Sequence, residues 1–311
     1  MGTPQFAVAT LRALVENNYR VVAVVPQPDK PVGRHGSVLQ PSPVKVFATE
    51  HAIPVLQPEK MKDPDFIDRL RSFQANLQVV VAFRMLPEVV WAMPAFGTFN
   101  VHAALLPDYR GAAPINWVII NGETTTGVTT FFLDHDIDTG RIIRQQPFHI
   151  PDDADVEYVY NGLMHLGARI CIDTIHDIVA AEGHPHTMPQ DNRLALHQAP
   201  KIFKDTCRID WQQEARSVYN LVRGLSPAPG AWTMLRCPDG AEIVLKIWHT
   251  TLTDVASTHP SGTLVRDKKH LYACCRDKLL LIDSLQLSGK RRMEALDFMN
   301  GMAEIEKYSV L

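Results

Sequence analysis

Apolar strand-like runs that alternate with helical patterns fill residues 1–182, and this alternation limits the possible fold more than any other feature of the chain. Apolar strands separated by helices are typical of a parallel sheet that is covered on both faces. We therefore predict an α/β, doubly wound, Rossmann-like parallel sheet. The strand candidates are 20–25, 77–82, 98–103 and 127–133, and the helix candidates are 6–15, 44–52, 66–73 and 156–181.

The remainder of the chain has a different pattern. Residues 182–198 are rich in proline, histidine and polar residues without a clean period, which is typical of a connector. Several short strand candidates and one helix candidate follow. Short strands separated by turns indicate an all-β module. We predict a catalytic domain over 1–182, a linker over 183–203 and an all-β domain over 204–311. The C-terminal candidates are a helix at 214–223 and strands at 232–235, 242–249, 262–265, 270–274 and 279–287.

The beginning of the chain does not fit a complete sheet of this kind. Gly2-Thr3-Pro4 reads as the turn that follows a strand, yet the sequence has no strand before it. A missing inner strand leaves buried backbone groups of its neighbours without partners, which is costly. We expect that the first strand of the sheet is missing and that the natural protein is longer at its N-terminus.

Composition excludes several classes of protein. A hydrophobic fraction of 46% and a charged fraction of 21% are ordinary for a globular chain of 311 residues. No run of about eighteen apolar residues and no signal-type leader is apparent, so we expect a cytoplasmic protein without a membrane partner. The five cysteines form no metal-type spacing and read as reduced thiols. A net charge of −3 does not suit a dedicated nucleic-acid binder. From residue 200 onward, however, the chain has 16 Lys and Arg and 13 Asp and Glu, so this part is mildly basic.

Three polar residues form the candidate catalytic group. Asn100 and His102 lie two positions apart near a predicted strand end, so their side chains point to the same face. Asp138 follows 36 residues after the histidine, in an Asp-Thr-Gly sequence. An imidazole can accept a proton from a nucleophile while an amide stabilises an oxyanion, and a carboxylate favours the charged imidazole. Taken singly, each fragment is equally compatible with a packed histidine or a simple turn.

The order of motifs resembles the folate-dependent formyltransferases, in particular the branch that formylates methionyl-tRNA. The resemblance rests on GTPQF, PDKPVGR, PSPVK, VVVAFRMLP, NVHAALLPDYRGAAP, DIDTG, APKIFKDTCRIDW and LQLSGKRRM, and it covers nearly the whole chain. It implies that Asn100, His102 and Asp138 are the catalytic residues and that the C-terminal domain is an OB-like barrel. The implied donor is 10-formyltetrahydrofolate, and the implied acceptor is the amino group of methionine on initiator tRNA. The resemblance implies no metal, and we expect a monomer.

The resemblance also assigns ligand contacts. The folate is expected against the loops at 80–87 and 104–107, where this chain has Ala104 in place of the usual serine and Phe83-Arg84 in place of Tyr-Gly. The tRNA is expected at Arg34 and at the basic cluster Lys290, Arg291 and Arg292; a solvated surface is the simpler interpretation of each. The predicted folate contacts are Phe83, Arg84, Met85, Leu86, Ala104, Leu105, Leu106 and Pro107.

Other functions stay open at this point. A sugar-nucleotide N-formyltransferase shares the catalytic trio and the folate, and a formyltetrahydrofolate hydrolase uses water as the acceptor. A folate- or tRNA-binding protein without catalysis is the non-enzymatic alternative, and the intact trio speaks against it. The sequences RGAAP and APKIFKDTCRIDW favour the tRNA enzyme of translation initiation.

Overall fold

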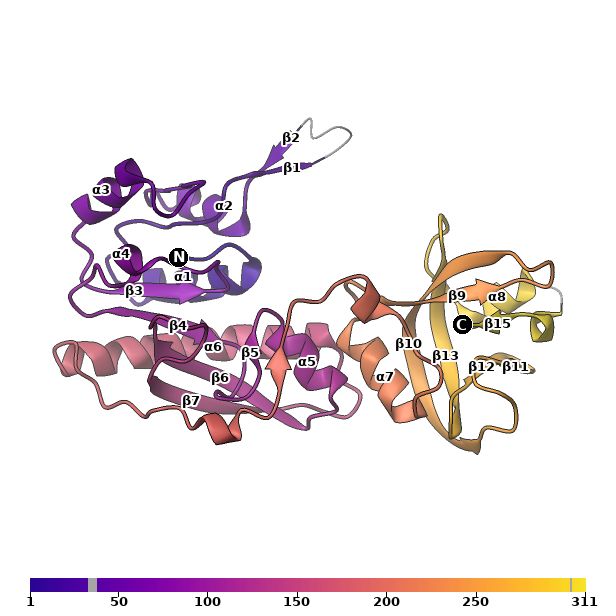
Figure 1. Ribbon diagram of the computed structural model, residues 1–311. Helices are drawn as coiled ribbons and strands as arrows, with labels where there is room; N and C mark the ends of the chain where they lie inside the picture. The colour runs from indigo at the N-terminus through magenta and orange to yellow at the C-terminus, as the bar shows by residue number, and fades with distance from the viewer. Residues whose placement is uncertain (33–37, 303) are drawn as a thin grey trace. The chain divides into compact units, whose positions relative to one another are not determined.

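The computed structural model describes residues 1–32, 38–302 and 304–311 (Figure 1). The chain divides into two compact units, and each is described by itself. The first unit comprises residues 1–111, 125–149 and 160–198, and the second comprises 112–124, 150–159 and 199–311. The second unit thus takes two short segments from the N-terminal half. The domain limits drawn from the sequence alone stay a prediction.

A four-stranded sheet forms the centre of the first unit, in the order β3-β4-β6-β7. β3 and β4 are parallel, whereas β6 runs antiparallel to both of its neighbours. The predicted α/β class is confirmed, with a sheet that is mixed rather than wholly parallel. Buried Phe99, Val101 and Phe131 belong to the core that holds it. The strands are β3 (Gln78–Val81), β4 (Thr98–His102), β6 (Thr125–Phe132) and β7 (Ile142–His149).

Helices with one buried apolar side accompany this sheet. Two of them begin at a proline behind a capping side chain: Ser42 accepts from the backbone N–H of Lys45, and Asp63 accepts from that of Asp65. The longest helix runs beside the sheet in Figure 1. The helices are α1 (Gln5–Glu16), α2 (Pro43–Glu50), α3 (Pro64–Ser72), α4 (Glu88–Trp91) and α6 (Val156–Ala180). The remaining short strands are β1 (Lys30–Val32), β2 (Val38–Gln40), β5 (Arg110–Gly111) and β8 (Gln198–Ala199).

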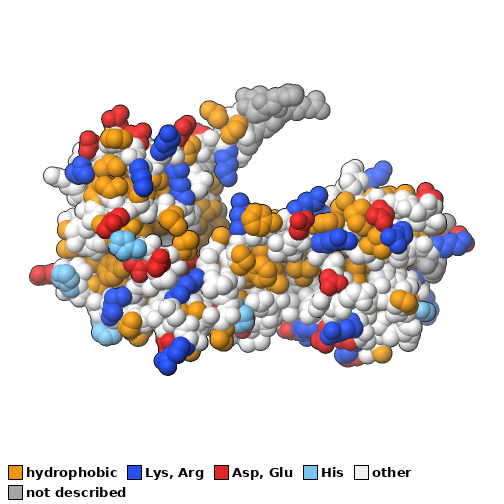
Figure 2. Space-filling view, viewed as in Figure 1, with side chains coloured by type: hydrophobic (Ala, Val, Ile, Leu, Met, Phe, Trp, Pro, Cys, Tyr) orange, Lys and Arg blue, Asp and Glu red, His pale blue; other side chains and the backbone are white. Residues whose placement is uncertain are grey.

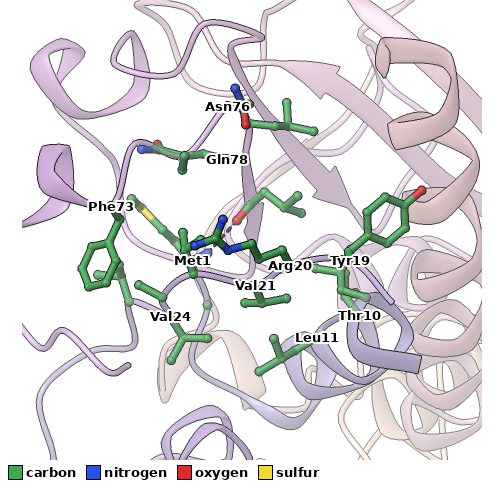
Figure 3. A pocket seen from close by; sticks show the side chains of 18 of the residues that line it. Met1, Thr10, Leu11, Tyr19, Arg20, Val21, Val24, Phe73, Asn76 and Gln78 are labelled. Atoms are coloured by element: carbon green, nitrogen blue, oxygen red, sulfur yellow. Dashed lines mark hydrogen bonds between the residues drawn. The ribbon is translucent and has the colours of Figure 1, made fainter. Parts of the chain in front are cut away.

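The predicted strand over residues 20–25 is reduced to one parallel bridge, between Val24 and Val55. Gly2 lies between this segment and β3: its N–H donates to the carbonyl of Val25 at 3.2 Å, and it forms a parallel bridge with Val81. A cavity of about 510 Å³ opens beside Gly2 (Figure 3), lined mainly by apolar residues such as Val21. The β-branched run therefore has little sheet to pair with, which explains why it does not extend.

The second unit is a curled antiparallel sheet in the order β11-β12-β13-β10-β9-β15, with β14 paired to β13. A bridge between Thr263 and Ser309 joins its two ends, as in a small barrel. Buried Leu245, Ile247 and Leu280 belong to its core. The predicted all-β module is confirmed. Its strands are β9 (Ala231–Arg236), β10 (Glu242–Ala256), β11 (Leu264–Asp267), β12 (His270–Cys274), β13 (Lys278–Leu287), β14 (Met293–Glu294) and β15 (Ser309–Val310).

Three helices complete the second unit: α5 (Pro114–Ile120), α7 (Ala215–Gly224) and α8 (Ala295–Asn300). α5 and α7 pack closely because Gly224 has no side chain; a Cβ there would lie 2.7 Å from Cγ1 of Ile120. The amide of Asn116 donates to the Gly224 carbonyl at 2.8 Å and fixes the contact.

The five cysteines are all free. Burial raises the pKa of Cys171 and of Cys275 to about 12, so these two thiols stay protonated and unreactive. Across the described residues no helix is both long and apolar enough to cross a membrane.

Candidate active site

Asn100 and His102 lie on β4, and their side chains project from the same face of the sheet, as the alternation predicted. The parallel pairing of Val80 with Asn100 places the carboxyl ends of β3 and β4 at one edge. Ligands of open α/β sheets bind beyond such carboxyl ends. The loops after β3 and β4 therefore lie where a substrate is expected.

The buried imidazole of His102 is held by one contact on each side. Its Nε2 lies 3.0 Å from the carbonyl oxygen of Tyr109, which can only accept, so Nε2 carries the hydrogen. Its Nδ1 lies 3.7 Å from Oδ2 of Asp138, which is too long for a direct hydrogen bond. A ring with its one hydrogen on Nε2 turns the lone pair of Nδ1 toward the carboxylate. Once Nδ1 takes up a proton, the charge lies next to Asp138.

Asp138 is fixed in the loop between β6 and β7 by several contacts. Its Oδ2 accepts from the backbone N–H of Gly111 at 3.0 Å. Its backbone adopts a left-handed conformation with φ 57°, which aspartate tolerates better than most residues. The amide of Gln190 donates to the carbonyls of Asp138 at 2.9 Å and Gly140 at 2.8 Å. A Cβ at Gly140 would lie 1.6 Å from the Phe132 carbonyl, so only glycine fits this position.

The amide of Asn100 is a polar group of this site that still needs a partner. Its Oδ1 is buried and has no hydrogen-bond partner within the described part of the chain. Buried polar atoms are rarely left in this state, because the lost hydration is not recovered. A ligand that enters the site can satisfy the amide, and the amide can rotate to present either its oxygen or its N–H group.

We expect Asn100→Ala to lower kcat by on the order of 100-fold, as loss of one oxyanion donor does. The melting temperature should not fall, because the variant removes a buried atom that has no partner in the free protein. Steady-state kinetics together with thermal unfolding check both parts. A kcat within twofold of the parent value would remove Asn100 from the catalytic group.

The loop after β3 presents both exposed and buried residues. Met85 is 69% exposed, Phe83 is half-buried, and Leu86 packs in the core. The guanidinium of Arg84 donates to the carbonyls of Pro58 and Glu59 at 2.5 and 2.9 Å. Phe83 and Met85 therefore offer the apolar surface of this loop, while Arg84 ties it to a neighbouring segment.

The hydroxyl of Thr129 holds the loop after β4 in place. This hydroxyl donates to the carbonyl of Ala104 at 2.7 Å and accepts from the N–H of Leu106 at 3.0 Å. The amide of Gln145 donates to the carbonyl of Leu106 at 2.7 Å. Leu105 and Pro107 are half-buried beside these residues. Sequence reasoning missed Thr129 and Gln145, whose positions have no local signal of a role in the loop.

The predicted basic residues are placed only in part. Arg34 lies outside the described residues. Lys290, Arg291 and Arg292 are exposed on the turn after β13 in the second unit. Arg292 donates to the hydroxyl of Ser284 at 2.9 Å, and its guanidinium lies 5.7 Å from the ring centroid of Trp248. In the face that Figure 2 shows, cationic side chains of this unit are interspersed with acidic and apolar ones.

No group of three or more His, Cys, Asp or Glu residues within the described ranges is arranged to hold a metal ion. The catalytic candidates are thus an amide, an imidazole and a carboxylate, a set suited to acyl-type transfer by proton abstraction and oxyanion stabilisation.

The fold and these residue types suit a transferase of acyl-type groups, and comparison with known proteins shows the family of this chain. Residues 1–175 match the formyl transferase family, and residues 201–303 match the formyl transferase C-terminal domain. The chain belongs to the formyltransferase family, in the branch of the methionyl-tRNA formyltransferases.

The relatives match over the full length. Methionyl-tRNA formyltransferase of Parabacteroides distasonis is 54% identical, with 100% of this chain and 97% of the relative covered. That of Bacteroides fragilis is 50% identical, with 100% and 96% covered. Among solved structures, the sugar 3N-formyl transferase WlaRD has a TM-score of 0.65 at 20% identity and covers 93% of this chain and 97% of its own. The similarity to WlaRD, at 20% identity, shows a shared fold alone.

Proposed function

We propose that this chain transfers the formyl group of 10-formyltetrahydrofolate to the amino group of methionyl initiator tRNA, for translation initiation in the cytoplasm, and that it acts as a monomer. The observation that carries the proposal is the full-length match, at 54% identity, to a relative that bears this activity in its name. The site supports it, because Asn100, His102 and Asp138 supply the groups that formyl transfer needs.

The residues can divide the chemistry as follows. The acceptor amine attacks the formyl carbon, and the carbonyl oxygen becomes an oxyanion that the Asn100 amide stabilises. Nδ1 of His102 takes the proton that the amine loses, and Asp138 stabilises the resulting imidazolium at 3.7 Å. The bond between the formyl carbon and N10 of the folate then breaks, and N10 receives the proton that His102 took from the amine.

Phe83 and Met85 are proposed to form part of the apolar wall for the pterin, with main-chain groups of the loops at 80–87 and 104–107 as its polar contacts. Ala104 supports this division. Its side chain is buried and its carbonyl is bound to Thr129, so the methyl group in place of a hydroxyl leaves the loop intact. Leu105 and Pro107 lie on the same loop and complete the wall.

The main alternative function is formylation of an amino sugar, since WlaRD, a sugar 3N-formyl transferase, has a similar fold. The two functions differ in the acceptor of the formyl group. Binding of tRNA releases counterions from its phosphates, so the affinity falls with salt by a log–log slope of about 0.7 to 0.9 per phosphate contact. Exposed Lys290, Arg291 and Arg292 are proposed as phosphate contacts.

We expect the triple variant Lys290→Gln, Arg291→Gln and Arg292→Gln to raise the KM for charged tRNA and to reduce the salt slope of kcat/KM by about two. The KM for the folate should not change. The control is Lys268→Gln with Lys269→Gln, which neutralises two exposed lysines on the turn between β11 and β12. Equal slopes in the parent, control and triple variant would exclude this cluster from tRNA binding. Faster formylation of an amino-sugar nucleotide than of tRNA would refute the proposed acceptor.

A further inference from the structure

A second histidine–carboxylate pair, His197 and Asp108, is connected to His102 through Tyr109. Asp108 accepts two hydrogen bonds from one distant residue: one from the backbone N–H of His197 at 2.5 Å, and one from Nδ1 of the same residue at 2.9 Å. The backbone N–H of Tyr109 in turn donates to the carbonyl of His197 at 3.0 Å. His197 is thus bound through its backbone on both sides and through its ring.

Tyr109 connects this pair to the active site. Its ring stacks on the His197 imidazole, with centroids 5.1 Å apart and planes inclined by 18°. Its carbonyl oxygen is the acceptor for Nε2 of His102. A single buried residue therefore touches His197 through its ring and N–H group, and touches the catalytic imidazole through its carbonyl.

The backbone of Tyr109 does not adopt this position by local preference. Its φ is 58°, in the left-handed region that aromatic residues rarely occupy. Strained conformations of this kind persist only when surrounding contacts impose them. The hydrogen bonds that Asp108 and His197 form around Tyr109 are contacts of this type. The left-handed backbone that they impose on Tyr109 sets the direction of its carbonyl.

We propose that His197 and Asp108 are positioning residues that hold the Tyr109 carbonyl against Nε2 of His102 and thereby keep Nδ1 free to accept the proton. This assignment of roles to the active site rests on the proposed function. In this role His197 contacts neither the substrate nor the reacting atoms, and it acts through Tyr109. A histidine whose second nitrogen is bound to a carbonyl has one tautomer and one ring orientation.

Two variants separate the contacts of His197. His197→Asn retains an N–H donor near the place of Nδ1, so the bond to Asp108 survives while the ring stack is lost. His197→Phe retains the stack and loses the bond. His197→Ala loses both. The matched control is His249→Ala, because His249 also pairs with a carboxylate, Asp283, at 2.7 Å and lies in the second unit.

The tautomer of His102 is the direct readout, measured by 15N NMR of the labelled protein without substrate. We expect Nε2–H with a bare Nδ1 in the parent and in His249→Ala, and a mixture of tautomers in His197→Ala. We expect kcat to fall about tenfold in His197→Ala, since small displacements of a catalytic group are costly, with both KM values within about twofold. His197→Asn and His197→Phe should each recover part of kcat.

Unchanged tautomer populations and an unchanged kcat in His197→Ala would overturn the proposal. A lower melting temperature with parental kcat per folded molecule would show a merely structural pair and would also overturn it. The NMR result does not depend on turnover. Absence of formyl transfer by the parent therefore refutes the proposed function and leaves the positioning role testable.

Discussion

Replacement of His102 by alanine should lower kcat for formyl transfer by on the order of 1,000-fold, the loss expected when a positioned general base is removed. Nδ1 of this residue faces Asp138 at 3.7 Å, and its Nε2 is already bound to Tyr109. Single-turnover measurement of the formylated product gives the chemical step directly.

The fold of this variant has to be checked, because His102 is 6% exposed and its removal leaves the Tyr109 carbonyl without its N–H donor. His102→Gln is the second variant, since its amide can still donate to that carbonyl but cannot accept a proton at neutral pH. Thermal unfolding should be close to parental for glutamine, with the same loss of kcat. Turnover within tenfold of the parent in folded His102→Gln would contradict the role of general base.

Asp138→Asn should also lower kcat by on the order of 1,000-fold, since a neutral amide cannot stabilise the imidazolium that forms when Nδ1 of His102 takes up a proton. Asparagine tolerates the left-handed backbone at this position and can still accept from the N–H of Gly111, so the loop should keep its shape.

Asp134→Asn is the matched control for Asp138→Asn. Its carboxylate lies in the same loop and accepts from the hydroxyl of Thr139 at 2.7 Å, without contact to His102. We expect its kcat to stay within about threefold of the parent, because the substitution conserves the size of the side chain and changes only an exposed loop contact. Equal losses in both variants would show that Asp138 only shapes the loop. Folate affinity, measured by fluorescence titration, should be unchanged in both.

The sequence pattern predicted strands that pair along their length with other strands of the two main sheets. Alternation and apolar runs located β3, β4 and β6, and β12 was predicted residue for residue. β7 was missed because it is an edge strand with Pro147 and four exposed residues in a row, which give no buried alternation. The β-branched run at 20–25 was expected as a strand, and it fails to extend because the cavity beside Gly2 separates it from β3.

The candidate site was predictable only where the signal is local or carried by resemblance. Asn100 and His102 follow from strand alternation, and Asp138 followed from the DIDTG motif. The residues that orient them could not be predicted, because their contacts join distant parts of the chain. Gln190 binds Asp138 across 52 positions, and His197 binds Asp108 across 89.

We expect this chain to move a formyl group from folate to methionyl-tRNA by means of Asn100, His102 and Asp138. The most direct test incubates the protein with 10-formyltetrahydrofolate that carries a labelled formyl group and with charged initiator tRNA, beside His102→Gln. We expect label on the amino group of methionine, in amounts equal to the tetrahydrofolate formed, and almost none with the variant. Label recovered as free formate or on an amino-sugar nucleotide but not on tRNA, or equal transfer by His102→Gln, would contradict the account.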